Sequence, residues 1–524
     1  MNIELATEII KKLNDLGVVD FLVCAGARNA PLVKVLSQAD GVNVQHFYDE
    51  RAAGFYALGR ARRRNRPVAV LTTSGTAVAE LLPATIEAHY SNVPLVLVTA
   101  DRPRHYRGSG APQTIEQVGL FSVYVENVFD VAKQIDVEPI VIAGPTHINV
   151  CFDEPLIDAP VSKLSLSEKL FSRQLTRRRS SAEVEVFFNK VKRPLVVLGA
   201  VHEAVRGRVL EFLTTLAAPI YAEAQSGLRE CPELADFTLR AGEGALSAEM
   251  VRENFDGLLR IGSVPTLRLW RDLDLSLAAL PVLSVSDIEF TGLARDQQVA
   301  ISYSDFFENS SVAELKGQPR AANAVLAADH RRRAQLEGLF EELPVAEPSL
   351  FRTLSNEIAI KDLVFVGNSL PIREWDLAAN PGHTHERVYA NRGANGIDGL
   401  LATFLGLSDV EQTNWLLLGD LSALYDLNAL SLADPKQKIR IVVINNSGGH
   451  IFERMFNDKA FLNAHNWRFQ KWAEMFGFEY LCIEGDKRPA ADCLCVDAQH
   501  AVIEIRPEPQ QTKEFWRRYA EICR

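Results

Sequence analysis

The sequence predicts an α/β protein built from doubly wound parallel sheets. Apolar runs at 67–72 and 94–99 are continuous rather than alternating, as in parallel strands covered on both faces. The stretch between them, 76–90, has helical spacing, so strand, helix and strand follow one another. A chain of 524 residues has room for about three such domains.

The predicted strands recur in three series along the chain. The first series begins with a strand at 21–24 and continues with the two runs above. Strands of the later series are expected at 194–199, 258–262 and 281–285, and then at 363–367, 415–419 and 439–444. A polar, basic stretch at 172–181 and a loop rich in Pro and Glu near 344–348 separate the series. We therefore expect domains at 1–172, 182–320 and 345–524.

Composition narrows the class of protein without naming a function. A net charge of −11 argues against nucleic acid as the main partner, but not against small anions, which local arginines can bind. We find no signal peptide and no apolar run near the ~18 residues that span a membrane, so we expect a cytoplasmic protein without a membrane partner. The seven cysteines lack disulfide or zinc spacing and are expected to be small buried residues.

Oxygen ligands follow two strands of the third series. One strand runs into Gly419 and Asp420, and the next runs into Asn445 and Asn446, 26 residues after Asp420. Ligands bind at the carboxyl ends of parallel strands, and this spacing can bring a carboxylate and an amide oxygen to adjacent ends. Hard oxygen ligands beside a diphosphate suit Mg²⁺. Either motif alone would be an ordinary turn.

This pair resembles the metal–diphosphate motif of thiamine-diphosphate (ThDP) enzymes, GDG followed by NN, with Leu421 in place of the second glycine. The resemblance implies three domains in the ThDP-enzyme arrangement and a site for ThDP and Mg²⁺, for which Mn²⁺ can substitute. Asp420, the Asn446 side chain and the main-chain oxygen of Gly448 would hold the metal. Further implied cofactor contacts are Ser74, Gly75, Gly419, Leu421, Ser422, His450 and Ile451.

A glutamate and a glycine-rich loop complete the implied cofactor site. Glu50 enters a predicted helix, where a carboxylate commonly favours the helix dipole. In ThDP enzymes a glutamate there contacts the pyrimidine ring and promotes loss of the thiazolium C2 proton, so Glu50 is the implied catalytic residue. In the loop 390–399, Ile397 would support the bent cofactor and backbone of Asn395 would accept from its amine.

The motifs are also similar to those of one particular family. They are GDLSALYDLNAL at 419–430, NRGANGIDG at 391–399, TSGTA at 73–77, TADRP at 99–103 and GGHIF at 448–452. These resemble the 2-succinyl-5-enolpyruvyl-6-hydroxy-3-cyclohexene-1-carboxylate (SEPHCHC) synthases of menaquinone biosynthesis. The resemblance implies that 2-oxoglutarate is decarboxylated on ThDP and that the remaining carbanion equivalent adds to isochorismate.

Both implied substrates are dicarboxylates, for which arginine is the natural bidentate partner. Strand ends carry Arg28, Arg102, Arg373 and Arg392 at positions that match family substrate contacts. Gln113 and Ser369 match further polar contacts, and Phe452 and Met455 match an apolar wall together with Ile451. Family architecture also implies a homodimer or homotetramer with active sites between subunits.

Two departures from the family pattern concern substrate binding. Ala27 stands where the family commonly has serine, and Leu267 stands where it has a lysine, with Arg268 beside it as a possible replacement. Two alternatives therefore remain open: another ThDP-dependent 2-oxoacid decarboxylase or carboligase, and a non-catalytic protein that binds ThDP or isochorismate. A nicotinamide-binding protein is disfavoured, because no GxGxxG follows the first strand.

Overall fold

The computed structural model describes residues 1–171, 182–294, 300–309, 312, 315, 323–456, 458–485 and 496–524, without the side chains of Arg454 and Met455. Packing divides the chain into two compact units. The first comprises Met1–Thr176, Gly393–Ser408 and Asp426–Ala433, and the second comprises Arg177–Arg392, Asp409–Tyr425 and Asp434–Arg524.

The first unit contains a six-stranded parallel sheet in the order β3-β1-β4-β5-β7-β6. Its strands are β1 (Asp20–Cys24), β3 (Asn43–Phe47), β4 (Val68–Thr72), β5 (Leu95–Asp101), β6 (Asn127–Val131) and β7 (Thr146–Cys151). The central strands β1, β4 and β5 are buried along their whole length, as their unbroken apolar sequences predict. The short strands β2 (Ala39–Asp40) and β8 (Leu164–Ser165) pair separately.

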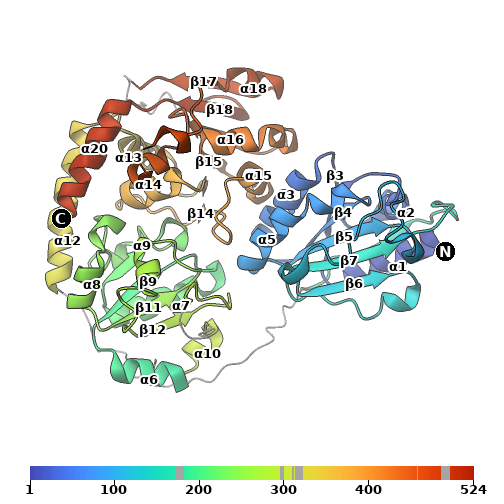
Figure 1. Cartoon of the computed structure of the whole chain (residues 1–524), viewed down its shortest axis with the longest axis horizontal. Coiled ribbons are helices and arrows are strands. Elements are labelled where there is room, and N and C mark those ends of the chain that lie inside the picture. The colour runs from blue at the N-terminus through green and yellow to red at the C-terminus, as the bar shows by residue number, and fades with distance from the viewer. Residues whose placement is uncertain are drawn as a thin grey trace. The chain divides into compact units, whose positions relative to one another are not determined.

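Helices cover both faces of this sheet (Figure 1). On one face lie α1 (Asn2–Asp15) and α2 (Ala30–Leu36), and on the other lie α3 (Glu50–Arg64) and α5 (Leu82–Tyr90). The expected single helix over 76–90 is instead two, because the short α4 (Thr76–Ala79) ends before α5 begins. Pro83 lies in the first turn of α5, where a missing N–H costs no helical hydrogen bond.

A helix from late in the chain completes the first unit. Helix α15 (Leu400–Leu407) packs along α3, and every one of its residues is buried. The two backbones approach closely at Gly59 and Gly406. A Cβ on Gly59 would overlap the carbonyl oxygen of Thr403, and one on Gly406 would overlap that of Tyr56.

The second unit contains two parallel sheets. The four-stranded sheet has the order β10-β9-β11-β12, with β9 (Pro194–Leu198), β10 (Ile220–Ala222), β11 (Gly257–Ile261) and β12 (Val282–Val285). Around it in sequence are α6 (Ala182–Lys190), α7 (Glu203–Leu216), α8 (Ala248–Asn254), α9 (Arg268–Asp272) and α10 (Tyr303–Phe307).

The other sheet of this unit has six strands in the order β14-β13-β15-β16-β18-β17. They are β13 (Leu363–Val366), β14 (Val388–Tyr389), β15 (Thr413–Gly419), β16 (Lys438–Ile444), β17 (Glu479–Ile483) and β18 (His500–Ile505). Its helices are α12 (Asn323–Glu342), α13 (Glu347–Glu357), α14 (Leu370–Ala378), α16 (Asp420–Tyr425), α17 (Glu453–Phe456), α18 (Gln470–Met475) and α20 (Pro509–Ile522).

The segment near 344–348 is not entirely the loop that its Pro and Glu content predicts. Helix α13 begins at Glu347, and Pro348 lies in its first turn, where proline is favoured. Glu347 is only 2% exposed. A carboxyl group expected in a loop is therefore part of the protein interior.

All three large sheets share one connection pattern. In each, the chain makes its first strand, adds the second on one side, and then crosses to add the third and fourth on the other. A reversal of this kind leaves a crevice at the carboxyl ends of the first and third strands, where ligands bind in open α/β sheets. In the first unit this crevice follows β1 and β4, and in the sheet of β13 it follows β13 and β15.

The parallel α/β class is thus confirmed, whereas the division into three domains at 172–182 and 320–345 stays a prediction. The basic stretch 172–181 lies outside the described residues, as do Cys493 and Cys495. The five described cysteines are free thiols, and Cys482 and Cys523 are only partly buried. Among the helices that the structure describes, none is long and apolar enough to cross a membrane.

Candidate active site

Arg28 lies at the crevice of the first unit, directly after β1. Its backbone N–H donates to Thr73 Oγ1 at 3.3 Å, which joins the loops after β1 and β4. Gly26 allows this approach, since a Cβ there would lie 2.6 Å from the Thr73 side chain. The buried guanidinium donates to the Phe152 carbonyl at 3.2 Å and lies 3.4 Å from Glu154.

The loop after β4 brings three predicted site residues together. Ser74 Oγ donates to the carbonyl of Gln113 at 2.8 Å, and Gln113 Nε2 donates to the carbonyl of Ser74 at 3.0 Å. Gly75 has a φ of +85°, and its N–H donates to Gln117 Oε1 at 3.4 Å. Arg102 joins the group, because its Nε and Nη2 both lie 3.3 Å from the carbonyl of Pro112.

Glu50 is the first residue of α3, which follows edge strand β3. Asp49 caps the helix by accepting from the N–H of Ala52 at 3.0 Å. Burial raises the pKa of Glu50, and the nearby carboxylates of Asp49 and Glu80 raise it further. A half-buried carboxyl with a raised pKa can hold or release a proton closer to neutrality than an exposed glutamate can.

Asp426 connects the start of α3 to the glycine-rich loop that precedes α15. Its Oδ1 lies 3.1 Å from Arg51 Nη1 and accepts from the N–H of Gly399 at 3.1 Å. Its Oδ2 accepts from the N–H of Leu401 at 3.2 Å. The loop that carries Asn395 and Ile397 therefore belongs to the same compact unit as Glu50.

In the second unit, the loops after β15 and β16 meet at Asp420. Its Oδ2 accepts from the N–H of Gly448 at 2.9 Å and lies 3.2 Å from His465 Nε2, while its Oδ1 accepts from the N–H of Leu421 at 2.6 Å. Burial raises the pKa of Asp420, although His465 and these N–H groups oppose the rise. Gly448 is required here, since a Cβ would lie 2.5 Å from the carbonyl oxygen of Leu462.

Asn446 is held by a buried carboxylate. Its Nδ2 donates to Glu347 Oε1 at 3.2 Å and to Oε2 at 3.0 Å. Because the amide nitrogen faces this carboxylate, the amide oxygen faces the opposite way and remains available as a ligand. Burial raises the pKa of Glu347, against hydrogen bonds from Asn446 and Glu374 that lower it.

Ser369 and Arg373 follow β13, and Arg392 follows the neighbouring edge strand β14. Arg373 Nη1 donates to the carbonyl of Ser369 at 2.6 Å. The guanidinium of Arg392 donates to Asn368 Oδ1 at 3.0 Å and to the hydroxyl of Thr266. Thr266 in turn donates its N–H and its hydroxyl to Glu223 Oε1, at 2.9 and 3.1 Å.

Other predicted site residues are placed less tightly. Leu267 is buried in an apolar cluster, and Arg268 is exposed and paired with Asp272 at 3.0 Å. No substitution of Arg268 for the family lysine is therefore evident in this structure. His450 Nδ1 lies 2.8 Å from Glu453, Phe452 is exposed and stacks on Phe456, and the side chain of Met455 lies outside the described part.

Similarity to known proteins decides the family. Residues 3–120 match the N-terminal TPP binding domain of thiamine pyrophosphate enzymes. The chain is 44% identical over 530 residues to the SEPHCHC synthase of Bdellovibrio bacteriovorus, covering 99% of this chain and 98% of that protein. It is 36% identical over 96% of its length to the synthase of Akkermansia muciniphila, and 35% identical over 83% to that of Chloroflexus aurantiacus, covering 96% and 80% of those proteins.

The chain belongs to the SEPHCHC synthase family.

Membership of this family makes thiamine diphosphate the cofactor, and the second unit fits a metal bound with it. Asp420 offers a carboxylate, Asn446 an amide oxygen and Gly448 a main-chain oxygen, which is the hard donor set that Mg²⁺ prefers. Only one of these donors is an acidic side chain. Accordingly, the described residues contain no cluster of three His, Cys, Asp or Glu side chains suited to a metal.

The departure at Leu421 leaves this donor set in place. Leu421 contributes a backbone N–H to Asp420, which any residue other than proline supplies. Ser422 is buried, and a Cβ added to Gly419 would meet no atom within 4 Å.

Sequence reasoning did not identify several residues that hold these synthase motifs in position. Glu347 and Thr266 contact motif residues from positions distant in the sequence, and Glu223 holds Thr266 in turn. Glu347 carried one usable signal, because an acidic residue directly before a proline often begins a helix. The other two carry no local pattern that distinguishes them from ordinary polar residues.

Proposed function

We propose that this chain decarboxylates 2-oxoglutarate and joins the remaining four-carbon unit to isochorismate, forming SEPHCHC and CO₂. The observation that carries the proposal is the 44% identity over 99% of the chain to a protein named for this product. Similarity over the full length covers the cofactor motifs and the arginine positions together. A likeness confined to residues 3–120 would support only ThDP binding.

We propose that Glu50 is the catalytic carboxyl group. Its position at the start of α3 and its raised pKa suit a group that shares a proton with a ring nitrogen of the cofactor. ThDP supplies the carbanion chemistry when it is bound. The role of Glu50 is to hold that proton, while Asn395 and Ile397 orient the ring.

The metal and substrate contacts are proposed on the same basis. Asp420, Asn446 and Gly448 would hold Mg²⁺ or Mn²⁺, and with it the diphosphate. Arg28, Arg102, Arg373 and Arg392 would bind the carboxylates of both substrates, with Gln113 and Ser369 as neutral partners. The contacts that fix Arg28 and Arg392 support this role, since a preorganised guanidinium loses less entropy on binding.

We also propose that the enzyme works as a homodimer or homotetramer. Family architecture has one subunit bind the pyrimidine and another the diphosphate, so an isolated monomer would be inactive. Sedimentation of the ThDP-loaded enzyme, combined with an activity assay at several protein concentrations, tests this. Full specific activity in a stable monomer would contradict it.

One assay separates the candidate functions. The purified protein is incubated with ThDP, Mg²⁺, 2-oxoglutarate and isochorismate, and both CO₂ release and isochorismate loss are followed. We expect CO₂ and isochorismate consumption in equal amounts. Turnover of pyruvate but not 2-oxoglutarate would instead identify another ThDP decarboxylase or carboligase. ThDP binding without turnover of any oxoacid would identify a non-catalytic binding protein.

A further inference from the structure

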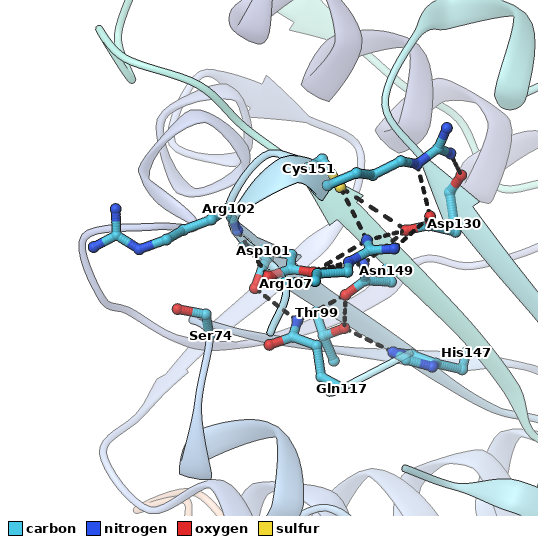
Figure 2. A network of polar contacts seen from close by, with 12 residues as sticks. Ser74, Thr99, Asp101, Arg102, Arg107, Gln117, Asp130, His147, Asn149 and Cys151 are labelled. Carbon is cyan, nitrogen blue, oxygen red and sulfur yellow. Dashed lines mark hydrogen bonds and ion pairs between the residues drawn. The ribbon is translucent and has the colours of Figure 1, made fainter. Parts of the chain in front are cut away.

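A partly buried network of polar side chains surrounds Arg107, which lies in the loop between Arg102 and Gln113 (Figure 2). Its guanidinium contacts two carboxylates on different strands. Nη2 and Nε lie 3.2 and 3.3 Å from Asp101 Oδ2, and Nη2 and Nη1 lie 2.6 and 2.9 Å from Asp130. Asp101 is fully buried, at the end of β5.

The Asp101 carboxylate connects this clamp to Arg102. Its Oδ1 accepts from the backbone N–H of Arg102 at 2.8 Å, while its Oδ2 is held by Arg107 and by Asn149 Nδ2 at 3.1 Å. One carboxylate therefore fixes the backbone from which the Arg102 side chain extends. The carboxylate itself is fixed by a cation further along the same loop.

The network continues from Asn149 to the loop after β4. Asn149 Oδ1 accepts from Gln117 Nε2 at 2.7 Å and from Thr99 Oγ1 at 3.2 Å. Gln117 Oε1 then accepts from the N–H of Gly75 at 3.4 Å. Arg102 and Gln113 lie at the two ends of this loop. Hydrogen bonds connect both of them to the loop after β4: Arg102 through Asp101, Asn149 and Gln117, and Gln113 directly to Ser74.

Electrostatics make Arg107 the central member of this network. Burial alone would raise the pKa of Asp130, but hydrogen bonds from Arg107 and Asn149 outweigh it and lower the pKa to about 2. The hydrogen bond to Asp130 raises the pKa of Arg107 in turn. Removing the guanidinium would leave two neighbouring carboxylates without their shared cation, and such a pair repels.

We propose that Arg107 is a positioning residue for substrate binding, which acts by holding Asp101 and thereby the Arg102 backbone and the loop as far as Gln113. This inference rests on the proposed function, in which Arg102 and Gln113 contact a dicarboxylate. Arg107 itself touches no substrate. Its guanidinium contacts Asp101, Asp130 and, at 3.3 Å, Cys151 Sγ.

The test compares Arg107→Ala with Arg104→Ala. Arg104 is the matched control, because it comes from the same loop and contacts Asp130 through Nε at 2.7 Å, whereas its other ion pair is with Asp136. We expect Arg107→Ala to raise the KM of at least one dicarboxylate about tenfold, below the ~100-fold cost of a 1 Å misplacement. We expect kcat and the Kd of ThDP to stay within about twofold, and Arg104→Ala to stay near wild type. Arg107→Lys, which keeps the charge, should recover part of the loss.

A double variant distinguishes action through Arg102 from a general loss of structure. If Arg107 works by placing Arg102, then Arg102→Ala with Arg107→Ala should have nearly the KM of Arg102→Ala alone. Effects on KM that multiply would overturn the inference, and so would an unchanged KM in folded Arg107→Ala. An equal loss in the Arg104 control would overturn it as well.

The same variants separate this inference from the proposed function. If Arg102→Ala raises KM while Arg107→Ala does not, only the inference fails. If Arg102→Ala itself leaves the KM of both substrates unchanged, the assignment of Arg102 to substrate binding fails, and the inference that depends on it fails too.

Discussion

Left-handed backbone occurs at four non-glycine residues of the candidate site. Gln113, Ser369, Asn395 and Ser447 have φ angles of +58°, +74°, +59° and +69°. Such conformations cost about 1–3 kcal/mol each and persist where the surrounding contacts enforce them. For Gln113 those contacts are its paired hydrogen bonds with Ser74. The contacts within the loop therefore hold Gln113 in a conformation that it would not otherwise favour.

Replacing Glu50 with glutamine should stop activation of the cofactor while leaving it bound. Glutamine keeps the size of the side chain and its place at the start of α3, but it cannot share a carboxyl proton with a ring nitrogen. Exchange of the C2 proton of bound ThDP, followed by NMR after quenching, should fall by several orders of magnitude. The Kd of ThDP should change little. Exchange at the wild-type rate would exclude Glu50 as the activating group.

Replacing Glu347 with leucine should weaken metal binding. Leucine cannot accept from Asn446 Nδ2, so the amide is free to rotate and present its nitrogen to the metal. Partners that orient a metal ligand are typically worth about 10–100-fold in affinity. Titration of Mn²⁺ by electron paramagnetic resonance in the presence of ThDP measures the loss. Glu347→Gln, which retains an acceptor, should lose less, and an unchanged Mn²⁺ affinity in the leucine variant would contradict the orienting role.

The sequence was sufficient for the motif residues but not for their supports. Asp420 and Asn446 stand in recognisable patterns that follow expected strands, and the structure places them after β15 and β16, while Glu50 begins α3, the helix that the sequence predicts. Glu347 and Thr266 could not be predicted, because they reach Asn446 and Arg392 across 99 and 126 residues of chain. Such contacts depend on sheet pairing, which a local pattern does not specify.

At the level of elements, helices α3 and α15 pack more closely than they could if the residues at their contact carried side chains. Gly59 and Gly406 look in the sequence like residues that weaken their helices, since glycine costs about 1 kcal/mol relative to alanine. In the structure each lies against the backbone of the other helix. The cost in helix propensity is offset by close packing of the two backbones.

Gly59→Ala and Gly406→Ala should each destabilise the first unit. The added methyl group would meet backbone rather than a movable side chain, so a cost of at least about 2 kcal/mol is expected. Gly207→Ala is the control, because Gly207 lies within α7 with open space around it and should gain about 0.5–1 kcal/mol. Urea unfolding followed by circular dichroism measures all three. Stability like that of wild type in both α3 and α15 variants would refute the close approach.

Acid should weaken strand β7 through a buried histidine. Burial lowers the pKa of His147 from 6.5 to about 4, so the folded strand favours the neutral ring. The unfolded chain takes up a proton below pH 6.5, and stability present above that pH is therefore lost as pH falls towards 4. At pH 5 the loss should reach about 2 kcal/mol.

Hydrogen exchange tests the role of His147. The opening free energy of β7, corrected for the intrinsic exchange rate at each pH, is compared at pH 7 and pH 5. In His147→Gln, the decrease attributed to the ring should disappear. An equal decrease in both proteins would assign it to other groups.

At the scale of the whole molecule, the predicted class rested on continuous apolar runs, and the parallel order of all three large sheets confirms it. The common connection pattern could not be predicted from those runs. Strand order depends on which strand edges pair. Strand β1 pairs in parallel with β3 on one side and with β4 on the other, and the apolar runs alone do not specify which strand takes which side. The packing of 393–408 with the first unit could not be predicted either, because the segment lies within the third strand series of the sequence.

The packing of α15 in the first unit has a consequence for folding during synthesis. Helix α3 ends at Arg64, and α15 begins at Leu400, 336 residues later. A ribosome adding ~5–20 residues per second needs roughly 20 seconds to one minute to make that interval. Throughout that time the glycine-bearing face of α3 has emerged without the helix that covers it. The first sheet should therefore reach full protection against proteases only after most of the message has been translated.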